Sequence, residues 1–218
     1  MRRLALALAA AWLTACSDAS QYSQAVAVLI DTSGTYADQV PEVARIVKRE
    51  VLPELVPGDT LAIVRIDSES YEKADVIELV TLDQRPSHAA AQKLALAKAL
   101  DEFAARTERS QYTDIPGAMM LAAEYLHEAG AKSRVILLFS DMESDLPPGA
   151  KRRFSEREFE GIRVAALNVK QLAPDNQNPD LLRARLASWQ KEVTRAGAGG
   201  FSTFLDPAKL APFLAEIR

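Results

Sequence analysis

Residues 25–35 read Ala-Val-Ala-Val-Leu-Ile-Asp-Thr-Ser-Gly-Thr, and this stretch decides the expected fold. Its first six residues are all apolar, without the alternation that marks a strand with one face in water. Such a run is typical of a strand buried on both faces, as in a parallel sheet between two layers of helices. The run ends at Asp31, and a loop of hydroxyl and glycine residues follows it.

The rest of the chain alternates between further strand and helix patterns. Strands are expected at 60–67, 76–82, 134–140, 161–169 and 201–205, and helices at 38–55, 87–106, 113–128, 182–193 and from 206 onward. This alternation predicts a Rossmann-like, three-layer, doubly wound α/β fold with a mostly parallel sheet. The strand at 76–82 is expected at an edge of that sheet, antiparallel to its neighbour. In such sheets ligands bind at the carboxyl ends of the strands.

Polar clusters lie just after two of these strands and at the start of one helix. Asp31, Ser33 and Thr35 share a five-residue loop, Thr113 stands at the start of a helix, and Asp141 follows the most apolar strand. Together they offer three hydroxyls and two carboxylates, with no Cys or His. Hard divalent cations such as Mg²⁺ prefer oxygen donors of this kind, with water completing the shell. The clusters therefore predict an oxygen-only cation site.

These residues, in this order, resemble the metal-ion-dependent adhesion site of von Willebrand factor A domains. The family pattern is Asp-x-Ser-x-Ser, then a distant Thr, then a distant Asp. The matching stretches here are Val-Leu-Ile-Asp-Thr-Ser-Gly-Thr at 28–35, Tyr-Thr-Asp-Ile-Pro-Gly-Ala at 112–118 and Leu-Phe-Ser-Asp at 138–141. The likeness spans about residues 25–205, and it implies a von Willebrand factor A-like domain over 25–218.

The resemblance also implies roles for the individual residues. Ser33, Thr35 and Thr113 would coordinate the metal through their hydroxyls, while Asp31 and Asp141 would act directly or through water. Thr35 stands where the family has a second Ser, so it keeps the hydroxyl and adds a methyl group. The metal would be Mg²⁺, or else Mn²⁺ or Ca²⁺, and it would take a carboxylate from a protein partner. The chain would then be a binding module and not an enzyme.

Two other interpretations remain open from the sequence. The loop that begins at Asp31 also resembles the first motif of haloacid-dehalogenase-type phosphatases, which are Mg²⁺-dependent, and Asp31 would then be the nucleophile. Thr81 would stand for their second motif, and the acidic residues of 141–145 for their last one. Ser33 argues against this, because most of these phosphatases have a general-acid Asp there. The second alternative is a von Willebrand factor A fold that acts as a metal-free interaction scaffold.

The N-terminal residues resemble the signal peptide of a bacterial lipoprotein. Two arginines precede an apolar run at 4–13 that is too short to span a bilayer comfortably. Leu-Thr-Ala-Cys at 13–16 resembles a lipobox, in which the cysteine carries the lipid. Residues 1–15 are therefore expected to be a signal peptide. Cys16, the only cysteine of the chain, is the expected lipidated residue.

An acyl anchor at Cys16 would hold the folded domain at a membrane of the bacterial envelope. Residues 16–24 are polar and are expected to be a tether. Ser17 is not the Asp of an inner-membrane retention signal, which predicts the outer membrane, facing the periplasm, in a Gram-negative cell. Loss of 1–15 removes two arginines and changes the net charge from −4 to −6. No basic run stands out, so no nucleic-acid partner is expected.

Overall fold

A computed structural model describes residues 22–167, 170 and 172–218 of the chain. The interpretations that concern residues 1–21 lie outside this part. They are the signal peptide, the lipidated Cys16 and most of the tether. Within the part that is described, no helix combines the length and the apolar character needed to cross a membrane.

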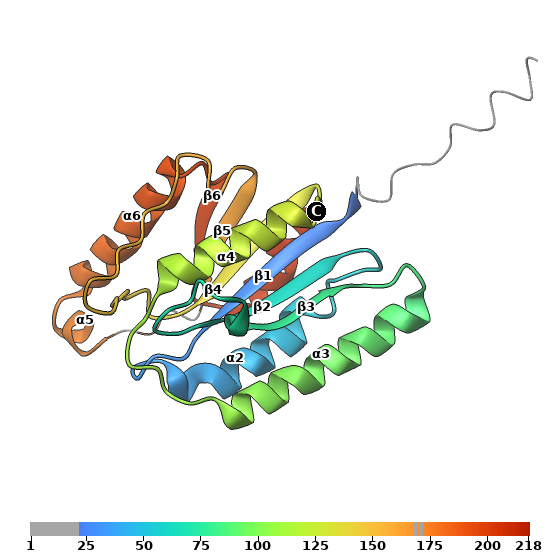
Figure 1. The fold of residues 1–218 in the computed structure, drawn as a ribbon, viewed down its shortest axis with the longest axis horizontal. Coiled ribbons are helices and arrows are strands. Elements are labelled where there is room, and N and C mark those ends of the chain that lie inside the picture. The colour runs from blue at the N-terminus through green and yellow to red at the C-terminus, as the bar shows by residue number, and fades with distance from the viewer. Residues whose placement is uncertain (1–21, 168–169, 171) are drawn as a thin grey trace, which may run out of the picture.

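Six strands form one sheet in the order β3-β2-β1-β4-β5-β6 (Figure 1). Their bounds are β1 Gln24–Asp31, β2 Thr60–Ile66, β3 Val76–Thr81, β4 Ser133–Phe139, β5 Ile162–Leu167 and β6 Gly200–Phe204. Neighbouring strands are parallel except β2 and β3, which are antiparallel, and β3 is an edge strand. This confirms the predicted three-layer α/β fold, with a mostly parallel sheet and one antiparallel edge strand.

Helices cover both faces of the sheet, which makes the fold three-layered (Figure 1). Their bounds are α2 Val40–Ile46, α3 Pro86–Arg106, α4 Ile115–Glu128, α5 Ala173–Gln177, α6 Pro179–Arg195 and α7 Leu210–Glu216. One core contains residues of α4 and α6, and the other contains residues of α2, α3 and α7. Leu29 of β1 belongs to the first core and Ile30 to the second. Both faces of β1 are therefore buried, which explains why its sequence is an unbroken apolar run.

The helices differ in detail from the sequence prediction. In place of one helix over 38–55, the chain forms a 3-10 turn at Ala37–Gln39, then α2, then a π-helical turn at Val47–Val51. The helix expected at 182–193 is α6, which begins earlier at Pro179. The short α5 has no counterpart in the prediction, because five residues are too few to show a helical period.

The sheet begins at Gln24, one residue before the predicted start of the domain. The backbone N–H of Gln24 donates to Asp59 Oδ1 (2.8 Å), and its side-chain amide donates to the carbonyl of Leu214 (3.1 Å). Both bonds are buried, and they tie the start of β1 to the turn before β2 and to α7. Gln24 therefore belongs to the sheet and not to the tether.

Candidate metal centre

The carboxyl ends of β1 and β4 lie side by side, because the strands are parallel neighbours with Ile30 beside Phe139. Asp31 is the last residue of β1, and Asp141 comes two residues after β4. The segment before α4 meets the same edge, since the N–H of Thr113 donates to the carbonyl of a residue in the loop after β4 (2.7 Å). The three polar clusters found in the sequence therefore meet at one edge of the sheet.

A cavity of about 600 Å³ opens at this edge. Four of the five predicted ligand residues line it, namely Ser33, Thr35, Thr113 and Asp141. Asp31 does not line the cavity, because it is buried behind the loop that carries Ser33 and Thr35. The structure thus places Asp31 as the support of the site and the other four at its surface.

The two carboxylate oxygens of Asp31 hold two loops in place. Oδ1 accepts a hydrogen bond from the backbone N–H of Ser33 (2.7 Å), and Oδ2 accepts one from the hydroxyl of Ser140 (2.6 Å). Burial raises the pKa of Asp31 to about 6, although these hydrogen bonds act in the opposite direction. The charged form of Asp31 is costly here, and a cation nearby would lower that cost.

Hydroxyl and carboxylate oxygens converge in front of Asp31. The Thr35 hydroxyl donates to Asp141 Oδ2 (2.7 Å), and Ser33 Oγ lies 3.3 Å from Thr35 Oγ1. Asp141 Oδ1 accepts the backbone N–H of Glu143 (2.9 Å), which fixes the orientation of the carboxylate. Oxygens from the loops after β1 and β4 are therefore within hydrogen-bond distance of one another.

The backbone around Thr113 is fixed, and its side chain is not used as a helix cap. The carbonyl of Thr113 accepts the N–H of Asp145 (3.1 Å) and the hydroxyl of Ser144 (3.0 Å). Asp114 caps α4 instead, because its Oδ1 accepts the N–H of Gly117 (2.8 Å). Thr113 can therefore face the cavity while its neighbour starts the helix.

The donor set is suited to a hard cation. Among the described residues, no three Asp, Glu, His or Cys side chains converge on one point. A metal at this edge would therefore need hydroxyl oxygens as well as carboxylates, and Ser33, Thr35 and Thr113 are the hydroxyls at the cavity. Oxygen-only sets with few carboxylates and several waters suit Mg²⁺ better than a thiophilic metal.

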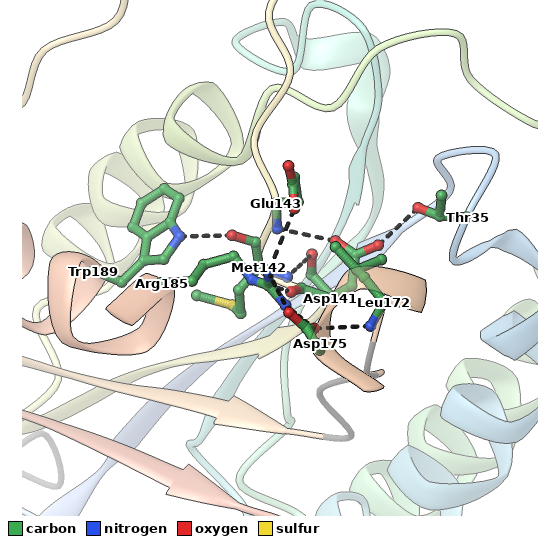
Figure 2. A network of polar contacts seen from close by, with 9 residues as sticks. Thr35, Asp141, Met142, Glu143, Leu172, Asp175, Arg185 and Trp189 are labelled. Carbon is green, nitrogen blue, oxygen red and sulfur yellow. Dashed lines mark hydrogen bonds and ion pairs between the residues drawn. The ribbon is translucent and has the colours of Figure 1, made fainter. Parts of the chain in front are cut away.

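Hydrogen bonds from side chains of α6 fix the loop after β4 (Figure 2). The sequence did not predict these contacts. Arg185 donates from Nε to the carbonyl of Asp141 (3.1 Å) and pairs with Asp175 (Nη2 to Oδ2, 2.7 Å). This pairing holds the pKa of Asp175 below its usual range. Trp189 donates from Nε1 to the carbonyl of Met142 (2.8 Å). The only sequence signal was the spacing of four between Arg185 and Trp189, which puts both on one face of a helix.

The same network supports a strained backbone conformation at Met142. Its φ is 64°, in the left-handed region, and no other non-glycine residue in the described part has a positive φ. Such a conformation costs about 1–3 kcal/mol and persists only when the surroundings hold it. The Met142 side chain is buried, and its N–H donates to Ser140 Oγ (2.9 Å). The loop that carries Asp141 is therefore held by the Ser140 hydroxyl and by the side chains of Arg185 and Trp189 from α6.

The residue suggested for the second phosphatase motif lies far from this edge. Thr81 pairs with Thr60, which is the first residue of β2. Asp31 pairs with Ile66, which is the last residue of β2. Thr81 and Asp31 are therefore at opposite ends of the sheet. The role of Thr81 in the phosphatase interpretation is wrong, because no single bound phosphate ester could contact both residues.

Comparisons with known proteins show a similarity of fold only. No protein-family model and no curated protein sequence matches the chain. The PilB minor pilin of Streptococcus sanguinis, as a D319A mutant, is similar with a TM-score of 0.54 and 11% identity, over 90% of this chain and 61% of that one. The conserved hypothetical protein BatB of Bacteroides thetaiotaomicron is similar with a TM-score of 0.51 and 14% identity, over 89% of this chain and 98% of that one. Also similar is a von Willebrand factor type A structure from Catenulispora acidiphila (TM-score 0.48, 15% identity, 89% of this chain and 41% of that one).

Proposed function

We propose that the chain is a von Willebrand factor A-type binding module that holds a Mg²⁺-class cation and, through it, an acidic group on a protein partner. One observation carries the proposal: Ser33, Thr35, Thr113 and Asp141 line one cavity, with the Thr35 hydroxyl 2.7 Å from Asp141 Oδ2. These residues come from three separate segments, as the family pattern requires. Mn²⁺ and Ca²⁺ are the alternative cations, and a metal-free scaffold is the alternative function.

The chemistry of this donor set favours recruitment over hydrolysis. A bound divalent cation would supply a positive charge that a partner carboxylate can coordinate. Of the five candidate residues only Asp141 brings a carboxylate to the cavity, so waters would fill part of the cation's shell and a partner carboxylate could replace one of them. Asp31 is fully buried and does not line the cavity, so its carboxylate is not placed to attack a phosphate ester bound there. We therefore favour a binding module without enzymatic activity.

We propose further that a lipid at Cys16 anchors the module to the bacterial envelope. Gln24 and Asp31 are the two ends of β1, and an eight-residue strand is about 26 Å long. An anchor that precedes Gln24 would therefore join the domain at the end of β1 opposite to the candidate metal centre. The likeness to a minor pilin supports a place in the envelope.

The Cys16→Ser variant tests the anchor. We expect it to move from the membrane pellet to the soluble fraction, because a protein without its acyl chains loses their buried methylene groups. Fractionation of cells that express each form, followed by immunoblotting, measures the shift. Retention of Cys16→Ser in the membrane pellet would show that something other than a lipid at Cys16 holds the protein.

The Asp141→Asn variant tests the cation site. We expect it to weaken Mg²⁺ binding about 10- to 100-fold, the usual range for loss of a group that orients or supports a metal ligand. Isothermal titration calorimetry on the full chain measures the affinity. Asp145→Asn is the matched control: it removes the same charge from an exposed residue on the same cavity wall, so it should bind Mg²⁺ nearly as well as the wild type. If the wild type binds no divalent cation, the proposed cation site is wrong.

A further inference from the structure

The outer edge of β6 carries backbone groups that the sheet does not use. The N–H of Ser133 in β4 donates to the carbonyl of Ser23 beside β1 (3.4 Å), and peptide groups point to alternate sides along a strand. The unbroken registers of β4 with β5 and of β5 with β6 carry this alternation to the edge. Gly200 and every second residue after it then bond to β5. The N–H and C=O groups of Phe201 and Thr203 point away from the sheet.

Nothing in the sequence of β6 protects this edge. Natural proteins block the edges of sheets with charged side chains, proline or β-bulges. The five residues of β6, Gly200–Phe204, include no charge and no proline, and their register with β5 has no irregularity. The other edge strand, β3, carries Glu78, and a bulge interrupts its pairing with β2. Of the two edges, β6 is therefore the one that is open to an additional strand.

The strand that fits β6 best is a second copy of β6. When two copies run antiparallel with Ser202 opposite Ser202, Phe201 and Thr203 face each other and exchange both of their outward hydrogen bonds. An aromatic side chain opposite a β-branched one is a favourable cross-strand pair. In the same register Phe204 faces Gly200, where a side chain would meet no atom within 4 Å. The aromatic ring therefore has room to cover the glycine, which is also a favourable pairing.

We propose that the chain forms a symmetric dimer in which β6 pairs antiparallel with β6 of a second copy, centred on Ser202. The two six-stranded sheets would become one continuous sheet. The two-fold axis is perpendicular to that sheet, so both copies turn the same helix layer to the same side. One membrane parallel to the sheet can then hold the anchors of both copies. The inference goes beyond the proposed function and does not depend on a bound cation.

Sedimentation velocity of the full chain over a range of concentrations tests the inference. We expect a reversible equilibrium between one chain and a species of twice its mass. Thr203→Pro should weaken this association at least about tenfold, because each copy loses an N–H that bonds to the other. The bonds between β6 and β5 do not use this N–H, so proline is tolerated there. Tm checks that the variant is folded.

A second variant avoids any effect of proline on the fold. Gly200→Lys places a charged side chain where Phe204 of the second copy would lie, and the space around Gly200 admits it within one chain. We expect this variant to be folded and to lose the dimer. The matched control is Leu79→Lys on β3, where the leucine is 45% exposed at the opposite edge of the sheet. It should keep the dimer.

Cysteine cross-linking tests the register. In the full-length Cys16→Ser chain, Ser202→Cys puts the two new thiols on facing residues whose Cα atoms are about 4.5 Å apart, within the range of a disulfide. Thr203→Cys puts them on residues offset by two positions on each strand, about 8 Å apart, which is too far. We expect mild oxidation to cross-link the first variant and not the second.

Three results would overturn the inference. If the chain sediments as a monomer at every concentration, the edge is left to a strand of another protein or stays unpaired. If a dimer forms and both Thr203→Pro and Gly200→Lys keep it while folded, another surface holds the two copies together. If Ser202→Cys cross-links no faster than Thr203→Cys, the antiparallel register centred on Ser202 is wrong. None of these results bears on the cation site.

Discussion

The Asp114→Ala variant is expected to lose about 3–5 kcal/mol of unfolding free energy, the usual result of removing one partner of a buried ion pair. Asp114 is almost fully buried and pairs with Arg152 (Oδ2 to Nη2, 2.8 Å). It also accepts the N–H of Ser70 (3.1 Å) and the N–H of Gly117 that caps α4 (2.8 Å). One carboxylate thus joins the loop after β2, the loop after β4 and the start of α4, next to Thr113.

Urea denaturation followed by circular dichroism measures this loss. Asp206→Ala is a suitable control, because Asp206 caps the short 3-10 turn Pro207–Lys209 from an exposed position. Loss of an N-cap of that kind costs about 0.5–2 kcal/mol. A loss for Asp114→Ala no larger than that of the control would mean that Asp114 is only a helix cap. In that case the three segments would be held together by other contacts.

A loss of similar size, about 3–5 kcal/mol, is expected for Asp59→Ala at the opposite end of the sheet. Asp59 is fully buried, and its carboxylate accepts two bonds from the Arg218 guanidinium (2.8 and 2.9 Å). It also accepts the backbone N–H groups of Gln24 and Val56 (2.8 Å each). The substitution would leave Arg218 without its ionic partner and two backbone donors without acceptors, which is costly in a buried position.

The control for Asp59→Ala is Asp83→Ala. Asp83 also pairs with an arginine, Arg85, at a comparable distance (2.7 Å), and this contact holds the pKa of Asp83 below its usual range. That pair is at the surface, where solvent screens the attraction. Denaturation should therefore separate the two variants clearly. Equal losses would contradict the account, because burial is what distinguishes the two ion pairs.

The main course of the chain could be predicted from the sequence because burial leaves a local pattern. The run at 25–30 has no polar residue, since both faces of β1 are covered by helices. The run at 76–82 is weaker, and β3 is the half-exposed, antiparallel edge strand that this suggests. The termini of helices were less certain. The helix 38–55 includes a 3-10 turn and a π-helical turn, which an apolar period alone does not distinguish from an α-helix.

Contacts between distant residues could not be predicted in the same way. Asp59 directly precedes β2 and Asp114 caps α4, yet each is also the buried half of an ion pair with a distant arginine. Arg185 of α6 bonds to the carbonyl of Asp141, which lies 44 residues earlier in the chain. Such pairings depend on where the folded chain brings two side chains, and spacing along the sequence does not encode that.

The candidate site was predictable to the extent that topology decides it. Parallel strands end at one edge, so Asp31 and Asp141 had to be neighbours once β1 and β4 were adjacent. The different positions of Asp31 and Asp141 relative to the cavity could not be predicted. Asp31 is buried behind the loop with both oxygens bonded to the protein, while Asp141 lines the cavity and meets the Thr35 hydroxyl.

The Mn²⁺ affinity of two variants at one position tests the central claim most directly. Thr35→Ser keeps the hydroxyl that donates to Asp141, and Thr35→Val replaces it with a methyl group of nearly the same shape. Electron paramagnetic resonance of free Mn²⁺ in titrations of the full chain gives both affinities, with Tm as the check that both variants are folded. The account predicts that Thr35→Ser binds nearly as well as the wild type and that Thr35→Val binds at least about tenfold more weakly. Equal affinity of a folded Thr35→Val and Thr35→Ser would contradict a cation site built on hydroxyl oxygens.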